Sequence, residues 1–340
     1  MRVPDPSFDH LAALSTADGL FEHAVFNHPR REHGYCVDDV ARGLVVTSRQ
    51  PDPTDDVVAL SRVYAEFVVR AIDRRGWVHN RRGETGPWTD AASLGDHWGR
   101  AVWGLGTAAA WSVDEHVRKR SLAAAGVCLR ARSPWPRAMA YAAVGAFEVL
   151  RSEPGHAGAL RLMTDARTML GHSTPDEAWP WPESRLTYAN AVVPEALIVI
   201  GTALDDDATL QKGLSLLTWL VEQETRGTHL SVTPAGGWVT GEARPAFDQQ
   251  PIEVAALAEA CFRAWDLTRE PSWAFVMDRC VAWFLGWNDS GLALFDPTTG
   301  GGYDGLLADC VNLNEGAEST LAAISTFQLA KLAAPAPVPA

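Results

Sequence analysis

The chain has 340 residues, of which 47% are apolar, enough to bury one large core or two modest ones, and this excludes a disordered protein. Its 42 acidic residues outnumber 29 basic ones, and the net charge of −13 argues against nucleic acid or an anionic membrane surface as a partner. No apolar run of about 18 residues occurs, so we expect no membrane insertion.

The cysteines and the two ends of the chain give further limits. Five widely spaced cysteines without a C-x-x-C pair predict neither a disulfide framework nor a zinc site. The N-terminal "MRVPDPSFDHLAALSTADGL" is acidic and lacks the apolar core of a signal peptide, so we expect a cytosolic protein. Residues 333–340 form a Pro/Ala tail that we expect to be disordered.

Two kinds of helix alternate along the chain. The first kind is apolar or small on nearly every side, which predicts burial on all sides, and the second is amphipathic and charged. In chain order, starting with the apolar kind, the predicted helices are 38–48, 53–73, 95–111, 112–131, 137–150, 155–170, 188–204, 206–224, 251–267, 271–287 and 316–332. Some amphipathic helices begin with Asp or Pro, which are N-terminal signals.

This alternation predicts an all-α fold, an (α/α)6 toroid in which six buried helices are wrapped by an outer ring. An open stack of hairpins would need a polar face on its terminal repeat, and the last helix is as apolar as the rest. Residues 5–20 could supply the twelfth helix. Strand signals are weak and limited to short stretches such as 228–240, which predicts a short β-hairpin between helices. We expect one domain over residues 1–332.

In such a toroid all inner helices run in the same direction, so their first turns and the preceding loops meet at one mouth. Polar residues accumulate at these positions, which favours a small-molecule or oligosaccharide site. The candidates are His33, Tyr35, Asp38, Asp39, Asp96, His97, Arg100, Tyr188, Asn190, Gln250, Glu253, Glu315 and Glu318.

Tryptophans in Gly/Pro-rich connections are a second group of candidates. Their flat faces suit stacking on sugar rings, although they could equally cap the core. They are Trp77, Trp88, Trp135, Trp179, Trp181, Trp238 and Trp287, and we take Trp238 as a substrate-binding residue.

Glycosidic cleavage without a metal needs two carboxyl groups, an acid and a base or nucleophile. Asp39 and Glu253 are the predicted catalytic pair, because each lies in the first turns of an inner helix. Arg42 is spaced to pair with Asp38 or Asp39; the spacing does not decide which, and we prefer Asp39 for catalysis. Helix capping is the structural alternative for these acids. Carboxyl groups on opposite helices favour an inverting mechanism, and no metal ion or cofactor is expected.

Two alternatives use the same fold. The first is sugar 2-epimerisation, in which histidines such as His33, His79 and His97 exchange a proton beside a carbonyl. The second is a non-catalytic glycan-binding module. No P-loop, G-x-G-x-x-G, G-x-S-x-G or H-E-x-x-H occurs, so nucleotide binding, hydrolase triads and zincin chemistry lack support.

The segments "GYCVDDVARGL", "FDQQPIEVAALAEA" and "NEGAESTLAAIS" resemble recurring blocks of six-hairpin, (α/α)6-barrel glycoside hydrolases, and the resemblance spans about residues 33–330. Where many of those proteins carry Asn and Asp, this chain has Val40 and Ala189, a departure that predicts a less hydrophilic substrate. The chain is also similar to hydrolases of mycobacterial methylmannose polysaccharide. That resemblance implies an endo-acting α-mannosidase with a polysaccharide or oligosaccharide substrate and a cleft open at both ends.

Overall fold

Helices alternate between an inner and an outer ring in the computed structural model, which describes residues 2–171 and 178–334. The inner helices are α2 (Val37–Arg49), α4 (Asp96–Trp111), α6 (Pro136–Ser152), α8 (Val192–Ala203), α10 (Pro251–Thr268) and α12 (Ala317–Ala333). The outer helices are α1 (Asp9–Ala13), α3 (Asp55–Ala71), α5 (Glu115–Cys128), α7 (Ala157–Leu170), α9 (Asp207–Gln223) and α11 (Pro271–Phe284).

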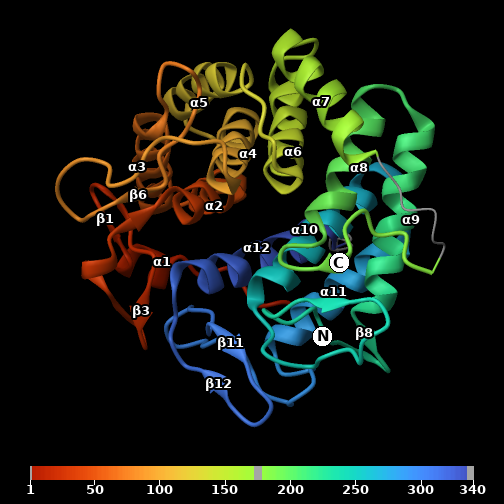
Figure 1. Cartoon of the computed structure of the whole chain (residues 1–340). Coiled ribbons are helices and arrows are strands. Elements are labelled where there is room, and N and C mark those ends of the chain that lie inside the picture. Colours follow the sequence, from red (N-terminus) through yellow and green to blue (C-terminus); the bar gives the residue numbers. More distant parts are fainter. Residues whose placement is uncertain (1, 172–177, 335–340) are drawn as a thin grey trace, which may run out of the picture.

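The inner ring is closed. Each inner helix packs against the next one in sequence, and α12 packs back against α2, so that the colours in Figure 1 follow one another around the ring. The short α1 lies against α12 and completes the outer ring. The predicted (α/α)6 toroid is therefore confirmed.

Burial follows the two kinds of helix. In α8 four consecutive residues from Leu197 to Ile200 have no exposed surface, as expected for a helix surrounded by protein. In α9, by contrast, one stripe that includes Leu216, Leu217 and Leu220 is buried. Side chains of Thr54, Asp114 and Asp206 accept hydrogen bonds from the first turns of outer helices, whereas the N-cap residues of the six inner helices make no such bond.

Helix α8 begins four residues later than predicted. Residues 188–191 form a turn instead, in which Ala189 has a left-handed backbone with φ of 44°. At the other end of the chain α12 extends to Ala333, and most of the predicted Pro/Ala tail, residues 335–340, lies outside the described residues. Among the helices of the described residues, none is long and apolar enough to cross a membrane.

Close packing of α4 against α6 depends on glycine. A Cβ atom at Gly145 in α6 would overlap the backbone of Val102 in α4, and neither helix backbone can give way cheaply. We therefore expect Gly145→Ala to lower the free energy of unfolding by about 1–3 kcal/mol. Gly126→Ala in α5 is the control, because its Cβ would meet nothing closer than 3.8 Å, and it should stabilise the helix by about 0.5–1 kcal/mol. Urea unfolding measures both, and equal effects would contradict this packing argument.

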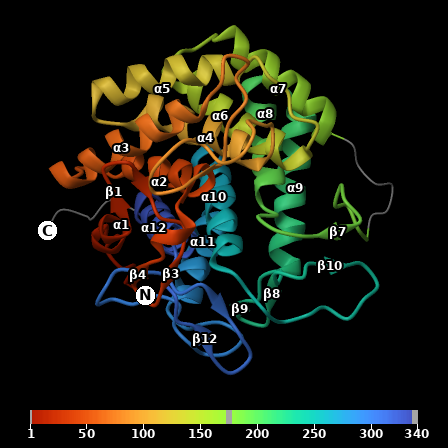
Figure 2. The ribbon, with the colours of Figure 1, turned by 60° about the vertical axis from the view of Figure 1, so that its left-hand side comes forward.

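Twelve two-residue strands lie in the connections of the described chain, and many of them gather beyond one end of the helices (Figure 2). Six antiparallel pairs are formed: β1 (Ser15–Thr16) with β2 (Gly19–Leu20), β3 (Ala24–Val25) with β4 (His28–Pro29), β5 (Tyr35–Cys36) with β6 (Arg81–Arg82), β7 (Arg185–Leu186) with β10 (Trp238–Val239), β8 (Thr225–Arg226) with β9 (His229–Leu230), and β11 (Gly305–Leu306) with β12 (Val311–Asn312).

The predicted hairpin within 228–240 is wrong in its pairing. This stretch holds β9 and β10, but β9 pairs with β8, which precedes it, and β10 pairs with β7, about fifty residues earlier in the chain. The Thr and Trp residues of this stretch favour the extended backbone of β9 and β10, but the partner of each strand depends on where the loops meet in space.

Candidate active site at the mouth of the ring

Two adjoining cavities open where the first turns of the inner helices meet their preceding loops. The first, here the aromatic cavity, has a volume of about 750 Å³ and is lined by residues that include Asp96, Arg100, Trp135, Arg137, Glu183, Tyr188, Gln250 and Glu318. The second, the acidic cavity, measures about 280 Å³ and is lined by residues that include Glu22, His23, Asp39, Asp248, Gln250, Asp304, Glu318 and Ser319. Gln250 and Glu318 line both, so the two cavities adjoin, and they are here called together the depression.

The centre of the ring below this depression is nearly filled. Its cavity measures about 30 Å³, room for about one or two water molecules, and Arg42 and Tyr141 lie in its lining. A ligand of sugar size therefore fits at the mouth and not along the axis of the ring.

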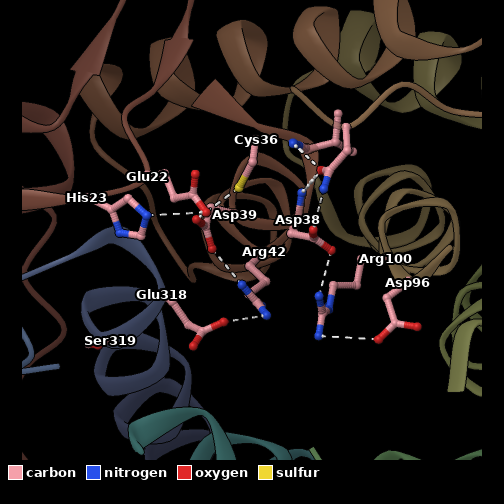
Figure 3. Close-up of polar contacts among 12 residues, drawn as sticks. Glu22, His23, Cys36, Asp38, Asp39, Arg42, Asp96, Arg100, Glu318 and Ser319 are labelled. Atoms are coloured by element: carbon pink, nitrogen blue, oxygen red, sulfur yellow. Dashed lines mark hydrogen bonds and ion pairs between the residues drawn. The ribbon is translucent and has the colours of Figure 1, made fainter. Parts of the chain in front are cut away.

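Asp39 lies in the wall of the acidic cavity and is 3% exposed. Its carboxylate accepts a hydrogen bond of 2.5 Å from Arg42 and one of 3.1 Å from the Cys36 thiol. The other side of the Arg42 guanidinium lies 2.8 Å from Glu318, so one cation joins two carboxylates (Figure 3). Burial raises the pKa of Asp39 to about 6; Arg42 opposes this shift, and the charge of Glu318 adds to it.

Asp38 has a different environment from Asp39. It pairs with Arg100 at 2.6 Å and accepts a hydrogen bond from the Asn80 side chain, and Arg100 also faces Asp96 at 3.9 Å (Figure 3). Burial works against ionisation of Asp38, but the two neighbouring arginines, Arg100 foremost, prevail and lower its pKa. Asp38 thus ties α2 to α4, while Asp39 lines the acidic cavity.

Glu253 is buried in the first turn of α10 and lines neither cavity. Its carboxylate accepts hydrogen bonds from the backbone of Ala189 and from the backbone and side chain of Asn190. Burial and then the charge of Glu224 raise the pKa of Glu253 to about 8. The adjoining residues of the same two segments, Tyr188 among them, do line the aromatic cavity, so Glu253 lies directly behind its wall.

Six of the predicted site residues therefore line the depression. They are Asp39, Asp96, Arg100, Tyr188, Gln250 and Glu318. Tyr188 donates a hydrogen bond of 2.6 Å to Asp96, which joins the loop before α8 to the start of α4. Of the tryptophans singled out from the sequence, Trp135 lines the aromatic cavity and is 62% exposed, as a stacking platform requires.

Two predicted aromatic contacts lie elsewhere. Tyr35 is 1% exposed; its hydroxyl lies 2.8 Å from that of Thr16, and its ring stacks on Phe21. Trp238 packs edge-on against Trp179 and lines neither cavity. Residue type and proximity to a helix start do not reveal which way such a ring points, and here both serve the packing of loops.

The remaining predicted residues also make contacts outside the two cavities. The ring of His97 lies 3.0 Å from the Val78 carbonyl, and His33 is exposed on a short 3-10 helix, Arg31–His33. Glu315 is buried and accepts a hydrogen bond of 2.7 Å from Thr299. Asn190 is fully buried beside Glu253.

Several cavity residues were not predicted, because they do not lie at or directly before the start of a predicted inner helix. Glu22 and His23 come from the segment before β3, and Asp304 comes from the connection before β11. Asp304 accepts hydrogen bonds from Ser319 and from the Gly316 backbone at the start of α12, which places this loop in the wall. Only the long-range contacts of these loops bring them to the mouth.

One cluster of possible metal ligands lies in this part of the described chain. Glu22, Cys36 and Asp39 each place one ligand-type atom within 4.8 Å of the others. Burial, followed by the charges of Asp39 and Asp38, raises the pKa of the Cys36 thiol well above its ordinary value. A protonated thiol is a poor metal ligand, and Cys36 acts here as a hydrogen-bond donor to Asp39.

Comparison with known proteins identifies the fold class. No family model matches the chain, and no curated protein matches it. Similar solved structures include a sugar epimerase from a ruminal bacterium, at 12% identity and a TM-score of 0.70, with 95% of each chain covered. A cellulase of C. cellulolyticum matches at 9% identity and a TM-score of 0.62, covering 92% of this chain and 87% of the cellulase. An α-amylase from Clostridium perfringens matches at 11% and 0.61, with 95% of each chain covered. At these identities the likeness shows the (α/α)6 fold alone.

Proposed function

We propose that the protein is a glycoside hydrolase that cleaves an oligosaccharide or polysaccharide bound across the two cavities. The observation that carries this proposal is Asp39, a buried carboxyl group with a perturbed pKa, in the wall of a cavity of sugar size. Trp135 and Tyr188, which line the adjoining aromatic cavity, are exposed aromatic side chains of the kind that stacks on sugar rings. The fold of the epimerase, cellulase and amylase named above supports an enzyme that acts on sugars.

For the substrate we propose an α-linked mannan, partly methylated, cleaved in endo fashion. This choice rests on the sequence resemblance described above. A depression that continues across two cavities agrees with a chain lying over the mouth, as endo cleavage requires.

For catalysis we propose that Glu253 is the general acid and Asp39 the general base. Near pH 7 a group with a pKa of about 8 is mostly protonated, and one with a pKa of about 6 is mostly ionised, which gives the two roles. Glu253 donates its proton to the glycosidic oxygen as the bond from that oxygen to the anomeric carbon breaks. Asp39 takes a proton from the water whose oxygen bonds to that carbon, and the product is a reducing end of inverted configuration. Glu253 lies behind the wall of the aromatic cavity, so this role requires that substrate binding release its hydrogen bonds to Ala189 and Asn190.

The pH dependence of hydrolysis follows from this assignment. Below about pH 6 Asp39 becomes protonated and no longer accepts the proton of water; above about pH 8 Glu253 ionises and no longer donates. We expect a bell-shaped profile of kcat/KM with limbs near these two values. Initial rates across the pH range, with reducing ends measured on a mannan oligosaccharide, test this. A rate that still rises above pH 9 would contradict the role of Glu253.

Glu318 is the competing second carboxylate, because it lines both cavities and its side chain is 42% exposed. Under the proposal Glu318→Gln retains hydrolysis. It also shifts the acid limb below pH 6, because the charge that helps to raise the pKa of Asp39 is gone and Arg42 is left to Asp39 alone. Glu253→Gln should abolish hydrolysis. The opposite pair of results, active Glu253→Gln and inactive Glu318→Gln, would assign the second role to Glu318.

Epimerisation receives less support from the geometry. Of the histidines in the described chain, His23 alone lines either cavity, whereas a proton exchange by histidines calls for a pair of them facing the substrate. His79 stacks on Trp88 and lies 2.8 Å from the Asp90 carbonyl, away from both cavities.

A further inference from the structure

An exposed phenylalanine lies at the tip of the β3–β4 hairpin. Phe26 is 58% exposed and has a φ of 49°, a left-handed conformation that bulky residues rarely adopt. Phe26 and Asn27 form the two-residue connection of this hairpin, where glycine is the favoured residue for a positive φ. A large apolar side chain is therefore exposed to solvent at a position where the backbone conformation favours glycine.

This hairpin tip is fixed to the wall of the acidic cavity. The backbone NH of Phe26 donates a hydrogen bond of 3.0 Å to the Asn314 side chain, and its carbonyl accepts one of 2.8 Å from the Glu315 backbone. The loop that makes these bonds also supplies Asn312 to the cavity wall, and Leu313 between them is 46% exposed. Phe26 and Leu313, here called the apolar ledge, are thus exposed side chains on two bonded segments, one of which supplies Asn312 to the wall of the acidic cavity.

The opposite end of the depression has exposed aromatic rings as well. Trp135 is 62% exposed and Tyr188 is 44% exposed, and both line the aromatic cavity. Glu318 lines both cavities and Asp39 lines the acidic one, and the loop that carries Leu313 lines the acidic cavity but not the aromatic one. A chain of sugars that crosses the depression would meet an exposed apolar face at each end.

We propose that Phe26, supported by Leu313, forms a sugar-binding subsite beyond the acidic cavity, so that the enzyme holds an internal segment of a glycan. The inference rests on the proposed function and extends it by naming the residues that bind the chain on the second side of the cleavage point. The apolar carbon of a sugar ring and the exposed ring of Phe26 are complementary, and the hairpin that carries Phe26 is hydrogen-bonded to the loop that contributes to the acidic cavity.

The test measures kcat/KM on α-linked manno-oligosaccharides of increasing length. We expect Phe26→Ala to lower kcat/KM by about fivefold to tenfold on chains long enough to pass the acidic cavity, and to leave short chains unaffected. Phe26→Gly should show the same loss while its melting temperature stays at or above that of the wild type, because glycine relaxes the turn. Phe275→Ala is the matched control, since this ring on α11 is 64% exposed and lines neither cavity.

Three results would overturn the subsite. In the first two, Phe26→Ala lowers kcat/KM equally on short and long chains, or lowers it on neither. In the third, the wild type self-associates and Phe26→Ala does not, which would make the apolar ledge a contact between two copies of the chain. Calorimetric titration of the same oligosaccharides separates this inference from the proposed function. If the wild type binds long chains through Phe26 without cleaving them, the subsite stands and the hydrolase proposal fails.

Discussion

Replacing Asp39 by asparagine is expected to lower kcat for glycan hydrolysis by about 10²–10⁴-fold, the range that a general acid or base typically contributes. Asparagine matches the shape of the carboxylate, and its single side-chain oxygen still accepts the hydrogen bond from Arg42, while its NH2 group replaces the oxygen that accepted from Cys36. It does not take a proton from water. Arg42 keeps its second partner, Glu318, so the fold should survive. Reducing ends released per unit time measure the loss, and circular dichroism confirms folding.

A matched control for this variant is Asp56→Asn, which removes one negative charge from the exposed side of α3. Its rate should equal that of the wild type, which excludes a general effect of net charge. Full activity in Asp39→Asn would remove Asp39 from the mechanism.

The largest loss of stability is expected from Arg49→Met. Arg49 at the end of α2 makes two hydrogen bonds, of 2.7 and 2.9 Å, to Glu259 in α10, and a third of 2.8 Å to Ser325 in α12. All three side chains are buried, and they join three inner helices where the ring closes. Removing the cation leaves Glu259 buried without its counter-charge, at a cost of about 3–5 kcal/mol. Urea unfolding gives the change in free energy of unfolding.

Two further variants separate the causes of that loss. The double variant Arg49→Met with Glu259→Met should regain most of the stability, because a buried ion pair and an apolar replacement of similar volume differ little. Arg120→Met removes an exposed cation from its pair with Glu66 on the outer ring and should change stability by less than about 1 kcal/mol. Equal losses in Arg49→Met and Arg120→Met would show that the buried pair does not hold the ring closed.

The ring architecture was predictable because the burial of each helix determines how apolar residues are distributed around it in the sequence. Helices apolar on every side, such as α8 and α10, must be surrounded by protein, and their alternation with amphipathic helices defines two concentric layers. Strand pairing was not predictable. The partners β7 and β10 have two residues each and lie far apart in the chain, so their pairing depends on where the surrounding loops come together.

The candidate site, too, was predictable only in part. Asp39, Asp96, Arg100, Gln250 and Glu318 were found from one geometric argument, since parallel inner helices present their first turns at one mouth. The direction of the inner helices does not determine how side chains point within that region. Tyr35 and Glu315, which were predicted there as well, are buried and line neither cavity.

The loop residues of the site were not predictable from the direction of the inner helices. Glu22, His23 and Asp304 reach the mouth through contacts between segments far apart in sequence, such as the bond between the backbone of Phe26 and the side chain of Asn314. Such contacts have no local pattern, because neither partner needs a particular neighbour in sequence to make them.

Hydrolysis in oxygen-18 water tests the central claim most directly. The wild type is incubated with a partly methylated α-mannan oligosaccharide, the Asp39→Asn variant serves as the control, and products are read by mass spectrometry. We predict shorter chains with one oxygen-18 atom at each new reducing end, and none with the variant. A parallel incubation in deuterium oxide tests for epimerisation. Chains of unchanged length that take up deuterium would show epimerisation and would contradict a mechanism based on two carboxyl groups and water.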